Sequence, residues 1–213
     1  MLNVFHKIRY VLMNKLNIKA KPKYPPDSEL TLHDDFSSLR SWTSVHPHLI
    51  EPSRNDGATF SIKAVNNKGF ACPLVISHEK FLYGGANSVI LTSQHPKVVH
   101  IFTLRTKEYK WGFEIVGETV IILLPANHYK RKLYNSNLPH KYGVYFNQKK
   151  NKIFWRIDDI TVCEMPLTIT VQKHAQLSLE TVSSKFPSKE LPQSMKVKSV
   201  EIFVHNNQET STK

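Results

Sequence analysis

The nine residues KWGFEIVGE, at positions 110–118, carry the pattern that decides the fold. Successive side chains of a β-strand point to opposite faces, so Phe113 and Ile115 are expected on one face and Glu114 and Glu118 on the other. The first pair suits a protein core. Acids on an otherwise apolar strand are costly to bury without partners, so they must meet water, a cation or a ligand. The stretch predicts a strand with one buried and one acidic face.

The same two-residue period continues on both sides of this stretch. Segments rich in Val, Ile, Phe, Tyr and Thr are separated by turn residues such as Asn-Asp-Gly at 55–57. Many short strands separated by turns are typical of a β-sandwich or barrel. The predicted strands are 30–36, 58–66, 70–77, 85–93, 98–106, 111–124, 142–147, 152–158, 160–164, 166–173 and 196–205. We therefore expect an all-β protein.

Composition divides the 213 residues into three parts: a basic segment 1–26, a body 27–205 and a polar tail 206–213. Within the body, 178–195 is rich in Ser, Pro and Lys and predicts a long loop. The first segment holds six Lys or Arg and no acid, with apolar residues at helical spacing over 3–17. It is either a solvated basic helix or an anchor on a membrane surface.

The overall composition limits the classes of function. A formal net charge of 29 − 17 = +12 favours nucleic acid, acidic polysaccharide or a membrane surface as partner. Two cysteines, Cys72 and Cys163, exclude a disulfide scaffold and a four-cysteine zinc site, and we expect both as free thiols. The sequence has no apolar run long enough for a membrane span and no clear cleavable signal. We expect a cytoplasmic protein, with an extracellular or periplasmic location left open.

Glu114 and Glu118 also suggest a reaction. Four residues along a strand separate Cα atoms by about 13 Å, but on a concave strand two carboxyl groups can approach to about 5–6 Å. That separation is used by retaining glycosidases, with one carboxylate as nucleophile and the other as acid/base. By its spacing alone, the pair equally fits two exposed glutamates on the solvent face of a sandwich.

Further segments along the body share one family resemblance. They are 32–36 (LHDDF) with Trp42, 77–84 (SHEKFLYG), 101–104 (IFTL), 114–118 (EIVGE), 139–146 (PHKYGVYF), 153–159 (IFWRIDD), 164–166 (EMP) and 195–205. In order and spacing the chain resembles glycoside hydrolase family 16, the laminarinases and β-glucanases. The resemblance implies a two-sheet antiparallel β-sandwich, the concanavalin A-like jelly roll.

The resemblance also implies roles for individual residues. Glu114 falls on the nucleophile position and Glu118 on the acid/base position of the family's Glu-x-Asp-x-Glu strand. The implied substrate-binding residues are Trp111, His140, Tyr109, Thr103 and Asn87. Trp111 would either stack on a sugar ring or serve as a tryptophan of the core or its rim. The resemblance implies no cofactor, and we predict no metal, since Lys198 stands near the place where a calcium ligand would lie.

Several cleft positions depart from the family pattern. The middle aspartate is Val116, an expected tryptophan is Thr103, and an expected Glu and Arg are Asn87 and Val89. Since the aspartate helps to keep the two glutamates in different protonation states, its loss predicts a weakened or retired enzyme.

The sequence thus predicts a monomeric family 16-like protein acting on internal β-linkages of a polysaccharide, neutral or anionic, by double displacement, with turnover weakened or lost. A non-catalytic, lectin-like glycan-binding module is the alternative. A basic nucleic-acid-binding β-domain is a third hypothesis, but we expect no nucleic-acid partner.

Overall fold

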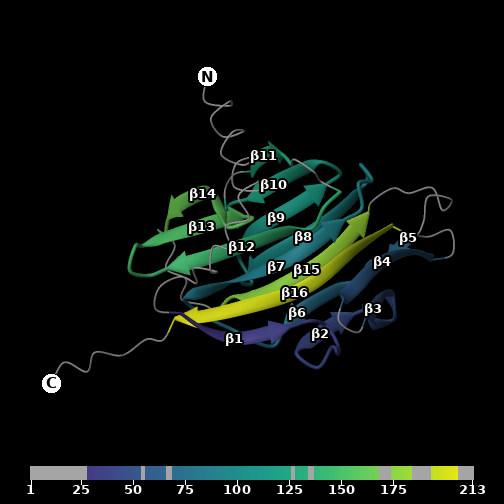
Figure 1. Ribbon diagram of the computed structural model, residues 1–213, viewed down its shortest axis with the longest axis horizontal. Coiled ribbons are helices and arrows are strands. Elements are labelled where there is room, and N and C mark those ends of the chain that lie inside the picture. The colour runs from purple at the N-terminus through teal and green to yellow at the C-terminus, as the bar shows by residue number, and fades with distance from the viewer. Residues whose placement is uncertain are drawn as a thin grey trace, which may run out of the picture.

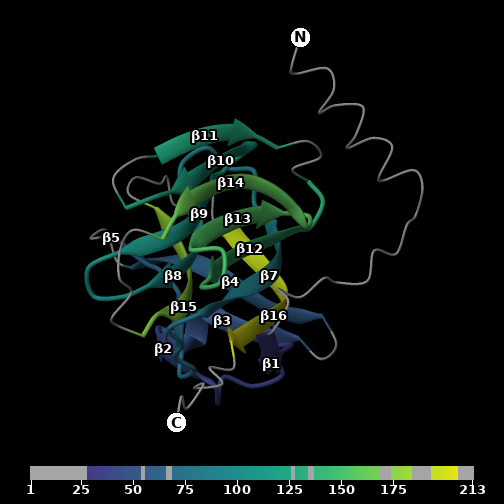
Figure 2. The same cartoon turned by 90° about the vertical axis from the view of Figure 1, so that its left-hand side faces the viewer.

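The computed structural model describes residues 28–53, 56–65, 69–125, 128–133, 137–167, 174–183 and 193–205. Over these ranges the chain forms two antiparallel sheets that lie face to face (Figures 1 and 2). A single 3₁₀ turn, Pro47–Leu49, is the one helical element of the described ranges. None of the described helical structure is long and apolar enough to cross a membrane.

The first sheet has nine strands in the order β14-β13-β12-β7-β16-β4-β3, with β1 paired to β16 and β5 to β4. Its long strand β16 runs across the middle of the view in Figure 1. The strand bounds are β1 (Ser28–Asp34), β3 (Ile50–Ser53), β4 (Gly57–Val65), β5 (Gly69–Ala71), β7 (Gly84–Thr92), β12 (His140–Asn147), β13 (Lys152–Ile157), β14 (Ile160–Pro166) and β16 (Gln193–His205).

The second sheet has seven strands in the order β11-β10-β9-β8-β15-β6-β2. Its strand bounds are β2 (Trp42–Val45), β6 (Leu74–Ser77), β8 (Val98–Arg105), β9 (Lys110–Val116), β10 (Thr119–Leu123), β11 (His128–Lys132) and β15 (Gln176–Ser183). The inner faces of the two sheets form the core, where Trp111 meets Phe146 edge-on at 5.1 Å and Phe113 lies 5.3 Å from Tyr142 between ring centroids. The predicted all-β jelly-roll sandwich is confirmed.

Three predicted elements are wrong. Residues 70–77 are not one strand, because β5 belongs to the nine-stranded sheet and β6 to the seven-stranded one. Residues 111–124 are not one strand but the hairpin of β9 and β10. Part of the predicted loop 178–195 is strand, because β15 runs to Ser183 and β16 begins at Gln193. The strand predicted over 166–173, the segment 1–26 and the tail 206–213 lie mostly or wholly outside the described residues.

Candidate functional site

The hairpin between β9 and β10 determines where the two predicted catalytic glutamates lie. Val116 pairs with Thr119, so Gly117 and Glu118 form a two-residue turn. Gly117 has a φ of +57°, which glycine adopts without steric cost and which such hairpin turns require. Glu118 is therefore exposed at the tip of the hairpin, and Glu114 is half-buried on the strand itself. The premise that both glutamates share one strand is wrong.

β9 presents one carboxylate on its outer face, the face turned away from the core. Trp111, Phe113 and Ile115 are buried in the core, so Lys110, Gly112, Glu114 and Val116 point outward. If Glu114 is aligned with the first glutamate of the Glu-x-Asp-x-Glu strand, the second glutamate position falls in the turn. If Glu114 is aligned with the second glutamate, Lys110 takes the position of the first glutamate and Gly112 that of the aspartate. Neither register places two carboxylates on this strand.

Gly112 leaves no room for a side chain. An added Cβ would lie 2.0 Å from the Phe102 carbonyl oxygen and 2.7 Å from the Thr103 Cα atom. Both are backbone atoms of β8, so β8 and β9 approach each other more closely here than a larger residue would allow. An aspartate at this position would therefore force the two strands apart.

A second outward carboxylate lies two strands away. Glu114 pairs with Ile101 of β8, and Ile101 pairs with Glu180 of β15, so the three form one row across the outer face of the seven-stranded sheet. Two inter-strand spacings put the Cα atoms of the two glutamates about 10 Å apart. Sequence reasoning missed Glu180 because it was assigned to a loop. The alternation of Leu177 and Leu179 with the polar Ser178 and Glu180 was the sequence signal that could have found it.

The next row across this face consists of small residues. Gly112 pairs with Thr103, and Thr103 pairs with Ser178, whose hydroxyl lies 2.7 Å from the Thr103 hydroxyl. We call these three residues the small row. Beyond it comes a row of longer side chains, formed by Lys110, Arg105 and Gln176. The small row thus lies between two rows of longer side chains, and Thr103 shares its face with Glu114.

Trp111 and Tyr109 are not placed to meet a sugar. Trp111 is fully buried between the sheets, and its indole N–H has no hydrogen-bond partner within the described part of the chain. Tyr109 is half-buried and packs on Trp111 with ring centroids 5.7 Å apart. The predicted stacking of Trp111 on a pyranose does not fit, because neither face of its ring is open.

His140 fastens the end of a hairpin. It is buried at the start of β12, and its Nδ1 atom lies 2.7 Å from a carboxylate oxygen of Asp158. The other Asp158 oxygen accepts a hydrogen bond of 2.9 Å from the Lys141 backbone N–H. Asp158 thereby ties the β13–β14 turn to β12. This pair stands apart from Glu114, which is on the outer face of the opposite sheet.

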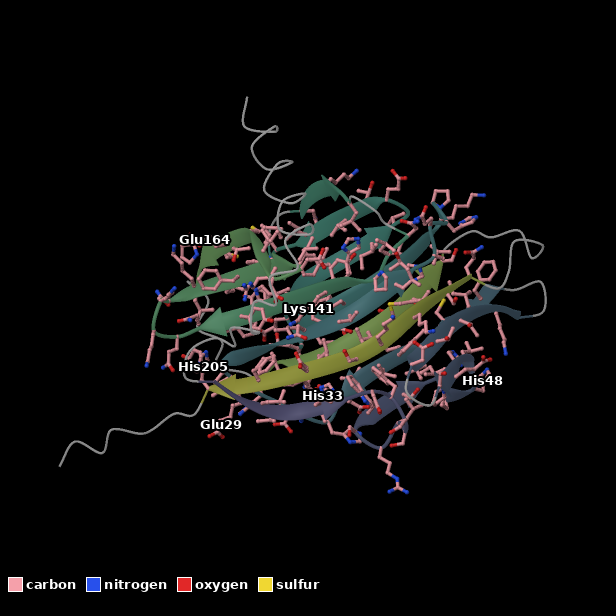
Figure 3. The ribbon with its side chains drawn as sticks, viewed as in Figure 1. Glu29, His33, His48, Lys141, Glu164 and His205 are labelled. Atoms are coloured by element: carbon pink, nitrogen blue, oxygen red, sulfur yellow. The ribbon has the colours of Figure 1, made fainter. Side chains whose placement is uncertain are left out.

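Asn87 lies on the outer face of the nine-stranded sheet. It is buried beneath its neighbours and donates a hydrogen bond of 3.2 Å to the Tyr145 hydroxyl. Burial raises the pKa of Tyr145 to about 12. Lys141 and His33, on the same sheet, project toward the viewer in Figure 3 and both lie near Glu201, at 4.0 and 3.8 Å. The structure therefore does not bring Asn87 together with Glu114.

The described residues offer no group of three or more His, Cys, Asp or Glu side chains that could hold a metal ion. Cys72 and Cys163 are both free and half-buried, and burial raises the pKa of each thiol. Neither cysteine is part of the rows described above.

Comparison with known proteins supports the fold. No family model and no curated protein matches the sequence. Among solved structures, apo Crh5 transglycosylase aligns with a TM-score of 0.69 and 19% identity over 84% of this chain and 85% of that one. A β-glucanase from Bacillus licheniformis aligns with a TM-score of 0.67 and 13% identity over 80% of this chain and 96% of that one. SCLam, a non-specific endo-β-1,3(4)-glucanase from family GH16, aligns with a TM-score of 0.70 and 11% identity over 85% of this chain and 93% of that one.

These alignments span most of each chain, and the identities are low enough that they establish architecture alone. The protein therefore shares the jelly-roll fold of the family 16 β-glucanases and transglycosylases.

Proposed function

We propose that the protein binds a polysaccharide chain across the outer face of its seven-stranded sheet and does not cleave it by double displacement. One observation carries the proposal: the turn at Gly117 and Glu118 leaves Glu114 as the one carboxylate on the outer face of β9. A retaining mechanism needs two carboxyl groups about 5–5.5 Å apart. Glu180 lies on another strand, about 10 Å away between Cα atoms, and the side chain of Ile101 stands between it and Glu114 in the row.

The rows on this face provide polar groups for sugar hydroxyls. Glu114 and Glu180 lie on one side of the small row, and Arg105 and Gln176 lie on the other. Outward side chains in the described strands of this sheet are aliphatic or polar, so we expect hydrogen bonds rather than aromatic stacking to carry the affinity. The solved structures of this fold include Crh5 transglycosylase in complex with NAG and several β-glucanases, which supports a glycan as ligand.

The proposal is tested with the full chain on soluble β-glucans and galactans. New reducing ends are measured together with binding by calorimetry, for the wild type and for Glu114→Gln, Glu118→Gln and Glu180→Gln. Glu164→Gln is the matched control, because Glu164 is an exposed strand glutamate on the other sheet. We expect no turnover, with binding to at least one polymer weakened about tenfold by Glu114→Gln or Glu180→Gln and unchanged by the control.

Turnover that disappears in Glu114→Gln and Glu118→Gln would overturn the proposal in favour of a retaining hydrolase. Turnover lost only in Glu114→Gln and Glu180→Gln would assign the reaction to the cross-strand pair and would overturn it equally. Absence of binding to every polymer would reject glycan recognition.

A further inference from the structure

Two cations face each other at one end of the outer face of the seven-stranded sheet. Arg105 is the last residue of β8 and Lys110 the first of β9, and they are register partners. Their inward neighbours Leu104 and Trp111 are buried, so Arg105 and Lys110 both point outward. Directly opposed residues of an antiparallel pair have Cβ atoms about 5 Å apart. The four-residue turn that joins the strands adds the exposed Lys107 and one acid, the exposed Glu108, so the cations are in excess at this end.

No carboxylate of the described residues forms an ion pair with either Arg105 or Lys110. The nearest outward acid on the same strand, Glu114, is four residues away, or about 13 Å between Cα atoms. Like charges directly opposite each other destabilise a sheet. The net charge of +12 gives further repulsion among the cations.

Cations on the nine-stranded sheet are arranged differently. Lys141 lies 3.5 Å from Asp159, Lys152 lies 2.6 Å from Glu164, and Lys196 contacts Asp56. Each of these lysines has an acid of the protein itself beside it. What distinguishes Arg105 and Lys110 is that two cations without a paired acid are register partners, and an anion bound between them would reduce their repulsion.

We propose that Arg105 and Lys110 form an anion subsite for a sulfate or carboxylate group of an acidic polysaccharide. Its backbone would cross the half-exposed rows on either side of the small row, whose own residues Thr103 and Ser178 are buried. This inference rests on the proposed function and specifies its ligand class. A guanidinium can donate two parallel hydrogen bonds to such a group, and an ammonium adds a mobile point charge. Glu114 and Glu180, on the far side of the small row, keep their contact with uncharged hydroxyls.

The test compares one sulfated galactan with the same polymer after chemical desulfation. Binding to the full chain is measured by calorimetry for the wild type, for Arg105→Gln with Lys110→Gln, and for the control Lys152→Gln. We expect the wild type to prefer the sulfated polymer by at least about tenfold, as charge-assisted hydrogen bonds predict. The double variant should bind both polymers with the affinity that the wild type has for the desulfated polymer. The control variant should keep the wild-type preference for the sulfated polymer.

Equal affinity of the wild type for both polymers would overturn the anion subsite and leave the proposed function standing. A preference that survives in the double variant would also overturn it, because the cations would then lie elsewhere. Failure to bind either form of the galactan while a neutral β-glucan binds would overturn the anion subsite alone, and failure to bind any of these polymers would reject the proposed function itself. A single-stranded oligonucleotide that binds more tightly than the sulfated polymer, and loses affinity steeply with salt, would overturn the proposal in favour of nucleic acid.

Discussion

His100 shows how one buried polar side chain affects the whole sandwich. It lies on the core side of β8, with Nε2 2.9 Å from the Ser93 hydroxyl and Nδ1 3.2 Å from the Thr181 hydroxyl. Burial lowers its pKa to about 4 from an ordinary value of 6.5. In the folded protein the imidazole therefore stays neutral at pH values between about 6.5 and 4, where in the unfolded chain it is already protonated.

This difference predicts a pH-dependent stability. Because the unfolded chain takes up the proton first, the stability tied to His100 is complete above pH 6.5 and is lost as the pH falls toward 4. Between pH 7 and pH 5 we expect a loss of about 2 kcal/mol. Urea unfolding of the wild type and of His100→Gln at both values measures it, and the variant should lose about 2 kcal/mol less. Parallel losses in the two proteins would contradict the assignment to His100.

Gly112 gives a second prediction at this scale. Gly112→Ala should cost about 3 kcal/mol, because the new methyl group would lie 2.0 Å from the Phe102 carbonyl oxygen and the strands must separate. Gly117→Asn is the matched control, since asparagine tolerates a φ of +57° and the nearest atom to the added Cβ is 3.3 Å away. The control should stay within about 1 kcal/mol of the wild type in urea unfolding. Equal losses would show that β8 and β9 can relax.

At the scale of the element, the β13–β14 turn holds two left-handed residues without glycine. Asp158 and Asp159 have φ values of 51° and 62°. Such a conformation costs an L-residue about 1–2 kcal/mol. For Asp158 this cost is offset by the hydrogen bonds of its side chain with His140 and the Lys141 backbone. The side chain of Asp159 offers only an ion pair of 3.5 Å with Lys141 at the surface.

Two substitutions that relieve the same backbone strain should therefore change the stability of the protein in opposite directions. Asp159→Gly should stabilise the protein by about 0.5–1 kcal/mol, because it removes strain and loses only an exposed ion pair. Asp158→Gly removes similar strain but leaves His140 without its carboxylate, and should destabilise by about 2 kcal/mol. Thermal unfolding of both variants gives the comparison. Destabilisation of both to the same extent would mean that the turn is not strained.

The sequence predicts most elements of the nine-stranded sheet because of their apolar alternation, which is regular in 152–157. It fails at 111–124, since apolar residues stand on both sides of a turn that removes only Gly117 and Glu118 from the strands. The change of the inward positions from 111, 113 and 115 to 120 and 122 is the one trace of the turn in the pattern. Gly-Glu is a weaker hairpin signal than Asn-Gly or Asp-Gly. It also fails at β15, where Ser178 and Glu180 face outward and make the strand look like a polar loop.

For the whole molecule, the architecture could be predicted and the site could not. A jelly roll needs only enough alternating strands to form two apolar inner faces, and residues such as Phe102, Phe113 and Val144 provide them. The candidate site depends on which distant strands become neighbours. Arg105 pairs with Lys110 within a hairpin. Glu180 lies in the same row as Glu114 because β15 pairs with β8, and local sequence does not predict that pairing. Trp111 illustrates the opposite error, since a residue assigned to a ligand lies in the core.

The tight turn after β9 also limits how the chain could change over time. Gly112 has no space for an acid, whereas Lys110 and Val116 also face outward and could each be replaced by one. Bringing Glu118 itself into the outward row beside Glu114 needs more than a replacement. An insertion would have to lengthen β9 and β10 by matching, even numbers of residues, because an odd number would turn every following side chain to the opposite face. Recovering Glu118 as the second acid of the strand would thus require a coordinated insertion of residues, a much rarer event than a point mutation.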